Sequence, residues 1–241
     1  MKKHSFITIL LTVLLSMVGK KTFAHDIAVA NLDGVTIYYV WTNYNTELAV
    51  SFRGDNHSSY SNEYSGDVNI PSSVYYNGND YSVTSIAQSA FEGCTSLTSI
   101  TIPSSVKTLE QGAFYGCSNL TSMNIPGGVT KIGLGAFSAC SKLTSITIPS
   151  SVTEIGKYAF DKCTSLNRIV SERPQPISID NSVFETYDDP YNVYSMATLI
   201  VPDGAKSAYK SSTGWKKFSN ISEASNQKFL TIHVAKAGTL S

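Results

Sequence analysis

Residues 97–103 read Leu-Thr-Ser-Ile-Thr-Ile-Pro, and this stretch returns with small changes at 120–126 and 143–149. Apolar and hydroxyl-bearing residues alternate in it, which predicts a β-strand with the isoleucines on its inner face and Ser99 and Thr101 on its outer face. The closing proline ends the strand because proline has no N–H group to donate to a β-ladder. The fold therefore depends on what covers the inner face.

Outward from this stretch, the sequence repeats with a step of 23 residues. The rows that keep this step are Phe91, Phe114, Phe137, Phe160; Cys94, Cys117, Cys140, Cys163; and Leu97, Leu120, Leu143, Leu166. One unit is too short to bury its own apolar stripe, so the phase predicts a solenoid in which neighbouring units cover each other. Stacked coils place equivalent residues about 4.8 Å apart, in buried columns of like side chains. Around Ala90–Cys94 we expect one helical or 3₁₀ turn.

The first residues have the pattern of a secretory signal peptide. Lys2 and Lys3 precede an apolar run over 6–18, and Thr22 and Ala24 supply small residues before a cleavage point. About 13 apolar residues are too few to cross a hydrocarbon core of about 30 Å. We therefore expect residues 1–24 to be removed and the chain to be secreted or held at the cell surface, with no membrane span.

The repeats divide the rest of the chain. The expected parts are a β-rich N-terminal cap with a degenerate first repeat (25–82), four regular repeats (83–172), an irregular last repeat with a C-terminal cap (173–224), and a linker leading into a truncated following domain (225–241). A solenoid exposes apolar edges at both ends and needs such caps. Residues 68–71 repeat the Ile-Pro ending of a unit, and residues 77–80 are a hairpin signal. Phe184 follows Phe160 by 24 residues, which makes the last unit irregular.

Repeats of the form S-A-F-x-G-C-x-x-L-T-S-I-T-I-P-S-S-V resemble the BspA-type leucine-rich repeats of bacterial surface proteins, especially those of Bacteroides-like organisms. The resemblance is close over 83–172 and extends over about 65–222. It implies a β-rich (α/β) leucine-rich repeat solenoid, a right-handed stack of parallel strands between a β N-terminal cap and an irregular C-terminal cap. It also implies adhesion and the binding of host or matrix proteins outside the cell.

Composition and motifs argue against nucleic-acid binding and catalysis. The 18 Lys and Arg balance the 18 Asp and Glu, whereas a nucleic-acid partner calls for a net basic face. The four histidines lie outside the repeats, and the sequence contains no G-x-S-x-G, H-E-x-x-H or phosphate-binding glycine loop. We expect no enzyme activity, no cofactor, no metal site and a monomeric chain.

The four cysteines have two interpretations. Stacked coils bring their Cα atoms to about 5 Å, a distance at which bridges such as Cys94–Cys117 can form. Equivalent side chains point the same way into the core, however, where a free cysteine behaves as a small apolar residue. The pattern favours a column of buried thiols over disulfides, and either over zinc, because ligands on one row cannot surround a metal.

Two surfaces are candidates for binding. The outward strand row consists of Ser99, Thr101, Ser122, Asn124, Ser145, Thr147, Asn167 and Arg168. The aromatic surface consists of Tyr187, Tyr191 and Tyr194 near the closing unit. A hydroxyl row can also serve only to keep a sheet soluble, and aromatic residues can serve only to cap a solenoid. The leading hypothesis is a non-catalytic adhesion module for an extracellular protein. The alternatives are a passive spacer that presents another domain and the capture of glycans through the cap aromatics.

Overall fold

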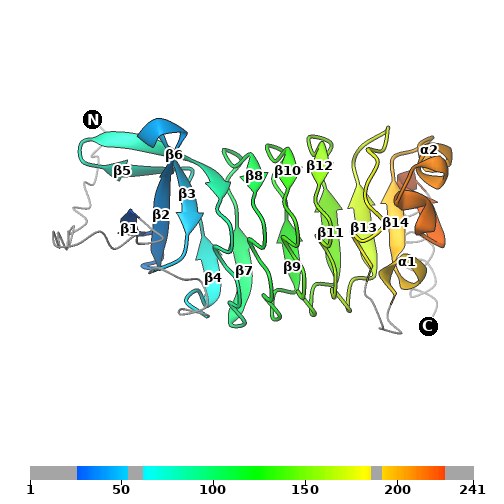
Figure 1. Cartoon of the computed structure of the whole chain (residues 1–241), viewed down its shortest axis with the longest axis horizontal. Coiled ribbons are helices and arrows are strands. Elements are labelled where there is room, and N and C mark those ends of the chain that lie inside the picture. Colours follow the sequence, from blue (N-terminus) through cyan, green and yellow to red (C-terminus); the bar gives the residue numbers. More distant parts are fainter. Residues whose placement is uncertain (1–25, 54–61, 186–191, 226–241) are drawn as a thin grey trace, which may run out of the picture.

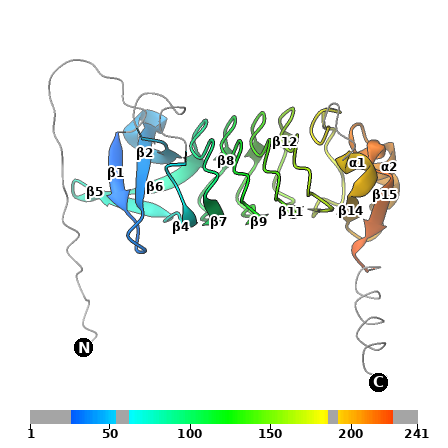
Figure 2. The same cartoon turned by 90° about the horizontal axis from the view of Figure 1, so that it is seen from below.

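A computed structural model describes residues 26–53, 62–185 and 192–225. Figure 1 shows an elongated stack of coils with a strand-rich cap at one end and short helices at the other. In the view turned by 90° the coils stand one behind another between the two caps (Figure 2). The expected signal peptide and all but the first residue of the expected linker lie outside the described residues.

The N-terminal cap joins the stack through a continuous sheet. Its strands are β1 (Ile27–Ala30), β2 (Thr36–Thr42), β3 (Glu47–Ser51), β5 (Ser73–Tyr76) and β6 (Asn79–Ile86), with the 3₁₀ turn η1 (Asn43–Asn45) between β2 and β3. The β5–β6 hairpin turns at Asn77 and Gly78, both with positive φ, as a tight hairpin turn of the mirror-image type requires. Strand β6 pairs in parallel with β3 on one side and with the first coil on the other.

Each coil contributes a strand to two sides of the stack. On one side lie β4 (Gly66–Asn69), β7 (Leu97–Thr101), β9 (Ser122–Asn124), β11 (Ser145–Ile148) and β13 (Arg168–Ser171). On the other lie β8 (Thr108–Leu109), β10 (Lys131–Ile132) and β12 (Glu154–Ile155). All pairings between coils are parallel. The predicted β-rich solenoid of parallel strands is therefore confirmed.

The third side of each coil consists of turns, and here the expected helical or 3₁₀ turn is wrong. Around Ala90–Cys94 the backbone makes separate i→i+3 hydrogen bonds, such as Glu92 N–H to Ser89 O at 3.0 Å. Ser89 and Gly93 adopt φ of 57° and 69°. Residues in this left-handed region cannot continue a right-handed helix, so the segment folds into successive β-turns.

The core is a column of parallel phenylalanine rings. Phe91, Phe114, Phe137 and Phe160 are fully buried, and neighbouring centroids in this row are 5.1–5.3 Å apart with interplanar angles of 2–10°. Phe184 extends the column, 5.1 Å from Phe160, although it is one residue out of phase. The extra residue is therefore absorbed before Phe184, and the column reaches the C-terminal cap.

The C-terminal cap closes the column with two further parallel strands and aromatic side chains. It contains α1 (Val193–Met196), β14 (Thr198–Val201), α2 (Lys206–Ser211), η3 (Trp215–Lys217) and β15 (Asn220–Glu223). Trp215 and Phe218 lie 5.9 and 5.3 Å from the Phe184 ring. The indole of Trp215 also donates to the carbonyl of Ile177 at 2.7 Å, so its N–H group stays paired when buried.

Close packing of neighbouring coils leads to a first prediction, at Gly156. A Cβ atom added there would lie 2.4 Å from the backbone nitrogen of Leu134, closer than real Cβ contacts allow. Gly156→Ala is expected to lower the free energy of unfolding by about 1–3 kcal/mol, because the coils must move apart. Gly127→Ala is the matched control, since its Cβ would meet nothing within 4 Å. Urea denaturation that finds the two variants equally stable would contradict this packing.

Candidate binding surface

The outward side chains of the strand side form columns in register, which we call the strand face. In the first column, residues that lie opposite one another along the sheet are Ser122, Ser145, Arg168, Thr198 and Asn220. In the second column Asn124 lies opposite Thr147. Towards the N-terminus, Ser99 and Thr101 on β7 lie opposite Asp67 and Asn69 on β4, which Figure 1 shows beside the other strands.

The structure corrects the place of one predicted residue, Asn167. Ser145 pairs with Arg168, so Asn167 lies opposite Thr144 and one residue before the strand. Its backbone N–H group donates to the carbonyl of Thr144 at 3.1 Å. Asn167 is exposed, but it belongs to the threonine position of the repeat and not to the two outward columns.

Hydroxyl groups elsewhere in the coils tie one coil to the next. Ser105 Oγ donates to the carbonyl of Val83 at 2.7 Å, and Ser151 Oγ donates to that of Val129 at 2.6 Å. Several threonines do the same between successive coils; those at 130, 144 and 153 bond a carbonyl of the preceding coil. These groups stabilise the stack, and their hydrogen-bonding capacity is already used.

The centre of the strand face differs. Within the described part of the chain, the side chains of Ser122, Asn124, Ser145 and Thr147 make no hydrogen bond and no ion pair. Ser122 and Asn124 are exposed, and Ser145 and Thr147 are half-buried. The central columns therefore present donors and acceptors that the fold itself does not use.

Sequence reasoning missed the acidic end of this face. Asp67 accepts hydrogen bonds from Ser99 Oγ at 2.7 Å and Thr98 Oγ1 at 3.0 Å. These two bonds lower the pKa of Asp67, because they stabilise the carboxylate. With Arg168 three coils further on, the face carries opposite charges on its two sides. Alignment of Asp67-Val68-Asn69 with the strand endings would have identified the carboxylate.

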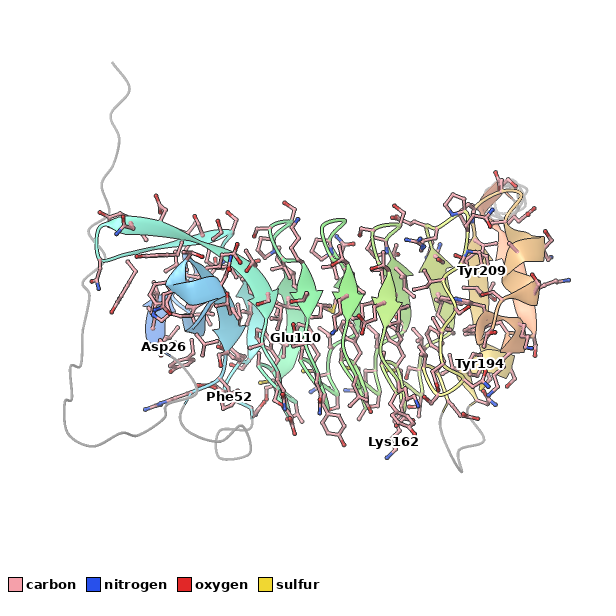
Figure 3. All side chains as sticks on the ribbon, turned by 45° about the horizontal axis from the view of Figure 1, so that its top comes forward. Asp26, Phe52, Glu110, Lys162, Tyr194 and Tyr209 are labelled. Carbon is pink, nitrogen blue, oxygen red and sulfur yellow. The ribbon has the colours of Figure 1, made fainter. Side chains whose placement is uncertain are left out.

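The predicted aromatic surface is corrected at Tyr194. This side chain is only 3% exposed, because its ring packs 4.8 Å from Phe218 and 5.8 Å from Phe184. Its hydroxyl donates to the carbonyl of Asn181 at 2.9 Å, and burial raises its pKa. Figure 3 shows Tyr194 within the C-terminal cap, where it covers the end of the core. Tyr187 and Tyr191 lie outside the described residues.

The four cysteines are free and buried. Three thiols donate to the carbonyl of a phenylalanine in the preceding coil, as in Cys140 Sγ to Phe114 O at 3.2 Å. Burial raises the pKa of every one of them, that of Cys140 to about 12. They form the column of buried thiols that the repeat favoured. The described segments contain no group of three metal-ligating side chains.

Comparison with known proteins followed from the coil geometry. A family model described as the BspA type leucine-rich repeat region matches residues 61–189 in six copies. No curated protein matched the chain. Across the described residues, no helix has the length and apolar character needed to span a bilayer.

Solved leucine-rich repeat proteins share the architecture. A leucine-rich repeat protein of T. pallidum is 21% identical with a TM-score of 0.52, over 71% of this chain and 91% of that chain. The pneumococcal vaccine antigen PcpA is 19% identical with a TM-score of 0.55, over 81% of this chain and 47% of that chain. A protein from Bacteroides ovatus is 25% identical with a TM-score of 0.44, over 77% and 59%. At the identities of the first two, the likeness shows the fold.

Proposed function

The chain belongs to the BspA-type leucine-rich repeat family, and from this premise we propose that it is a non-catalytic extracellular module that binds a host or matrix protein through the strand face. The family consists of surface and protein-interaction repeats in general. The identity of the partner, adhesion itself and export through residues 1–24 are parts of the proposal. The export pattern of those residues supports the extracellular location.

One observation carries the choice of surface. Hydroxyl groups on the other corners of the coils bond neighbouring coils, whereas Ser122, Asn124, Ser145 and Thr147 leave theirs unused within the described residues. Equivalent groups recur at the strand spacing of about 4.8 Å, so an extended partner meets the same contact several times. Individually weak contacts that form together give a useful affinity.

The test measures binding of the purified chain to immobilised extracellular-matrix proteins. Replacement of Ser122, Asn124 and Ser145 together by alanine is expected to weaken binding by about tenfold or more. Three hydrogen bonds worth about 0.5–1.5 kcal/mol each are lost, and about 1.4 kcal/mol is a factor of ten in Kd. Surface plasmon resonance gives the affinity, and circular dichroism checks that the fold is unchanged.

Ser104→Ala with Ser150→Ala is the matched control, because both serines are exposed at a turn and off the strand face. Equal loss in the control and the strand-face variant would contradict the assignment of the surface. Absence of saturable binding to any matrix protein would favour the passive spacer. Binding to glycans in place of proteins would favour carbohydrate capture.

A further inference from the structure

The turn side of the stack carries a groove that the strand face does not include. It has a volume of about 460 Å³ and runs across four coils, from Gln88 and Glu92 to Tyr158 and Asp161. Backbone bonds between coils, such as Phe114 N–H to Ala136 O at 2.7 Å, lie beneath it. We call this feature the turn groove.

Departures from the repeat create the turn groove. One position of the unit is serine, glycine, glycine and tyrosine in successive coils, at 89, 112, 135 and 158. Gly112 and Gly135 have no side chain to fill the middle, and Ser138 is small and buried where the preceding coil has Tyr115. The middle of the groove is therefore hollow, with larger side chains around it.

Tyr158 is held in a costly backbone conformation at the end of this row. Its φ is 58°, in the left-handed region that the two glycines occupy at the equivalent positions. A bulky residue pays conformational energy there and is uncommon. The ring is 39% exposed and lines the groove, while Tyr115 and Leu134 expose 43% and 44% nearby. A strained, exposed aromatic ring beside other exposed apolar side chains indicates a surface shaped for a ligand.

The charges of the groove have one sign. Its lining residues include the carboxylates Glu92 and Asp161 and no lysine or arginine. The Oδ1 atom of Asp161 is buried and has no hydrogen-bond partner within the described chain. Burial raises the pKa of this carboxyl, and the neighbouring Lys162, which points outward in Figure 3, lowers it only in part. The site therefore lacks a cationic donor at Asp161.

The two carboxylates also have a defined separation. Glu92 and Asp161 occupy the same position of the repeat three coils apart. At the coil steps of 5.1–5.3 Å seen for the phenylalanine column, this is roughly 15 Å. An extended peptide rises about 3.4 Å per residue, so side chains four residues apart stand about 14 Å apart.

We propose that the turn groove binds an extended basic peptide segment, with two arginine or lysine side chains four residues apart on Glu92 and Asp161 and an apolar side chain between them against Tyr115 and Leu134. Tyr158 offers its ring face to the cation that approaches Asp161. A neutral glycan could stack on the tyrosines, but it would leave both carboxylates without a counter-charge. Charge and spacing favour the peptide.

The test uses two labelled peptides of the same composition, Arg-Ser-Leu-Ser-Arg and Ser-Arg-Leu-Arg-Ser, with blocked ends. Fluorescence anisotropy with the full chain is expected to show the first binding about tenfold more tightly than the second, with weaker binding at higher ionic strength. Tyr158→Gly and Asp161→Asn are each expected to reduce the affinity for the first peptide about tenfold.

Both variants are expected to fold. Tyr158→Gly restores the residue found at the two equivalent positions and relieves the strain, so its melting temperature should equal or exceed that of the parent chain. Asp161→Asn keeps the size of the side chain. Tyr75→Ser is the matched control, because Tyr75 is 67% exposed on β5 and lies outside the groove.

Three outcomes would overturn the proposal: equal or undetectable binding of the two peptides, loss of binding in Tyr75→Ser, or binding of a neutral oligosaccharide that Tyr158→Gly abolishes. The strand-face variant at Ser122, Asn124 and Ser145 separates this groove from the proposed function. That variant should bind the first peptide as the parent chain does. Failure of either surface can then be recognised without the other.

Discussion

Phe137→Ala is expected to lower the free energy of unfolding by roughly 3–5 kcal/mol, because the ring is fully buried and its removal leaves a cavity. Rings lie on both of its faces, Phe114 at 5.3 Å and Phe160 at 5.3 Å, and nearly parallel to it. The backbone bonds from Phe137 N–H to Ala159 O and from Phe114 N–H to Ala136 O hold the coils at this spacing. The neighbours therefore cannot collapse fully into the space.

Thermal melting and urea denaturation measure this loss. For a chain of this size, the melting temperature falls by about 2–4 °C for each kcal/mol. Thr147→Ala is the control, since its side chain lies on the strand face of the next strand, and its effect should stay within about 0.5 kcal/mol. A loss below about 1 kcal/mol in Phe137→Ala would mean that the column does not hold the coils together.

The repeat could be predicted from the sequence because its period is strict. Every row that keeps the step of 23 residues, from the phenylalanines to the leucines, becomes a buried column in the structure. Stacking converts equality of sequence position into contact in space, so long-range contacts follow directly from the period. The same rule places Ser122 beside Ser145 and Asn124 beside Thr147.

Prediction failed where the period is broken. Tyr194 follows the out-of-phase Phe184, so no row fixed its direction, and packing against Phe218 decided its burial. Asp67 lies in a degenerate unit whose place became evident only through the pairing of β4 with β7. The turn groove arises from side chains that are absent, at Gly112 and Gly135, and a consensus of the repeats does not record such a hollow.

The buried thiols predict a loss of stability in alkali. Burial raises the pKa of Cys140 from 9.0 to about 12, so the folded chain keeps its proton where the unfolded chain releases it. The unfolded state then binds fewer protons, and the free energy of unfolding falls as pH rises. The stabilisation is complete below about pH 9 and is lost between about pH 9 and 12. From pH 9 to 10 the expected loss is about 1 kcal/mol for each fully buried thiol.

Cys117 and Cys163 have pKa values raised in the same direction, so together with Cys140 the three thiols should lower the stability by about 3 kcal/mol over this interval. Urea denaturation at pH 8, 9 and 10 measures the slope. Buried tyrosines such as Tyr64 add to it mainly above about pH 10, and they remain in the control variant Cys140→Ala. That variant should lose about 1 kcal/mol less than the parent chain between pH 9 and 10. Equal slopes in the two chains would show that the thiol of Cys140 ionises as readily in the folded state as in the unfolded state, and would place it outside the apolar column.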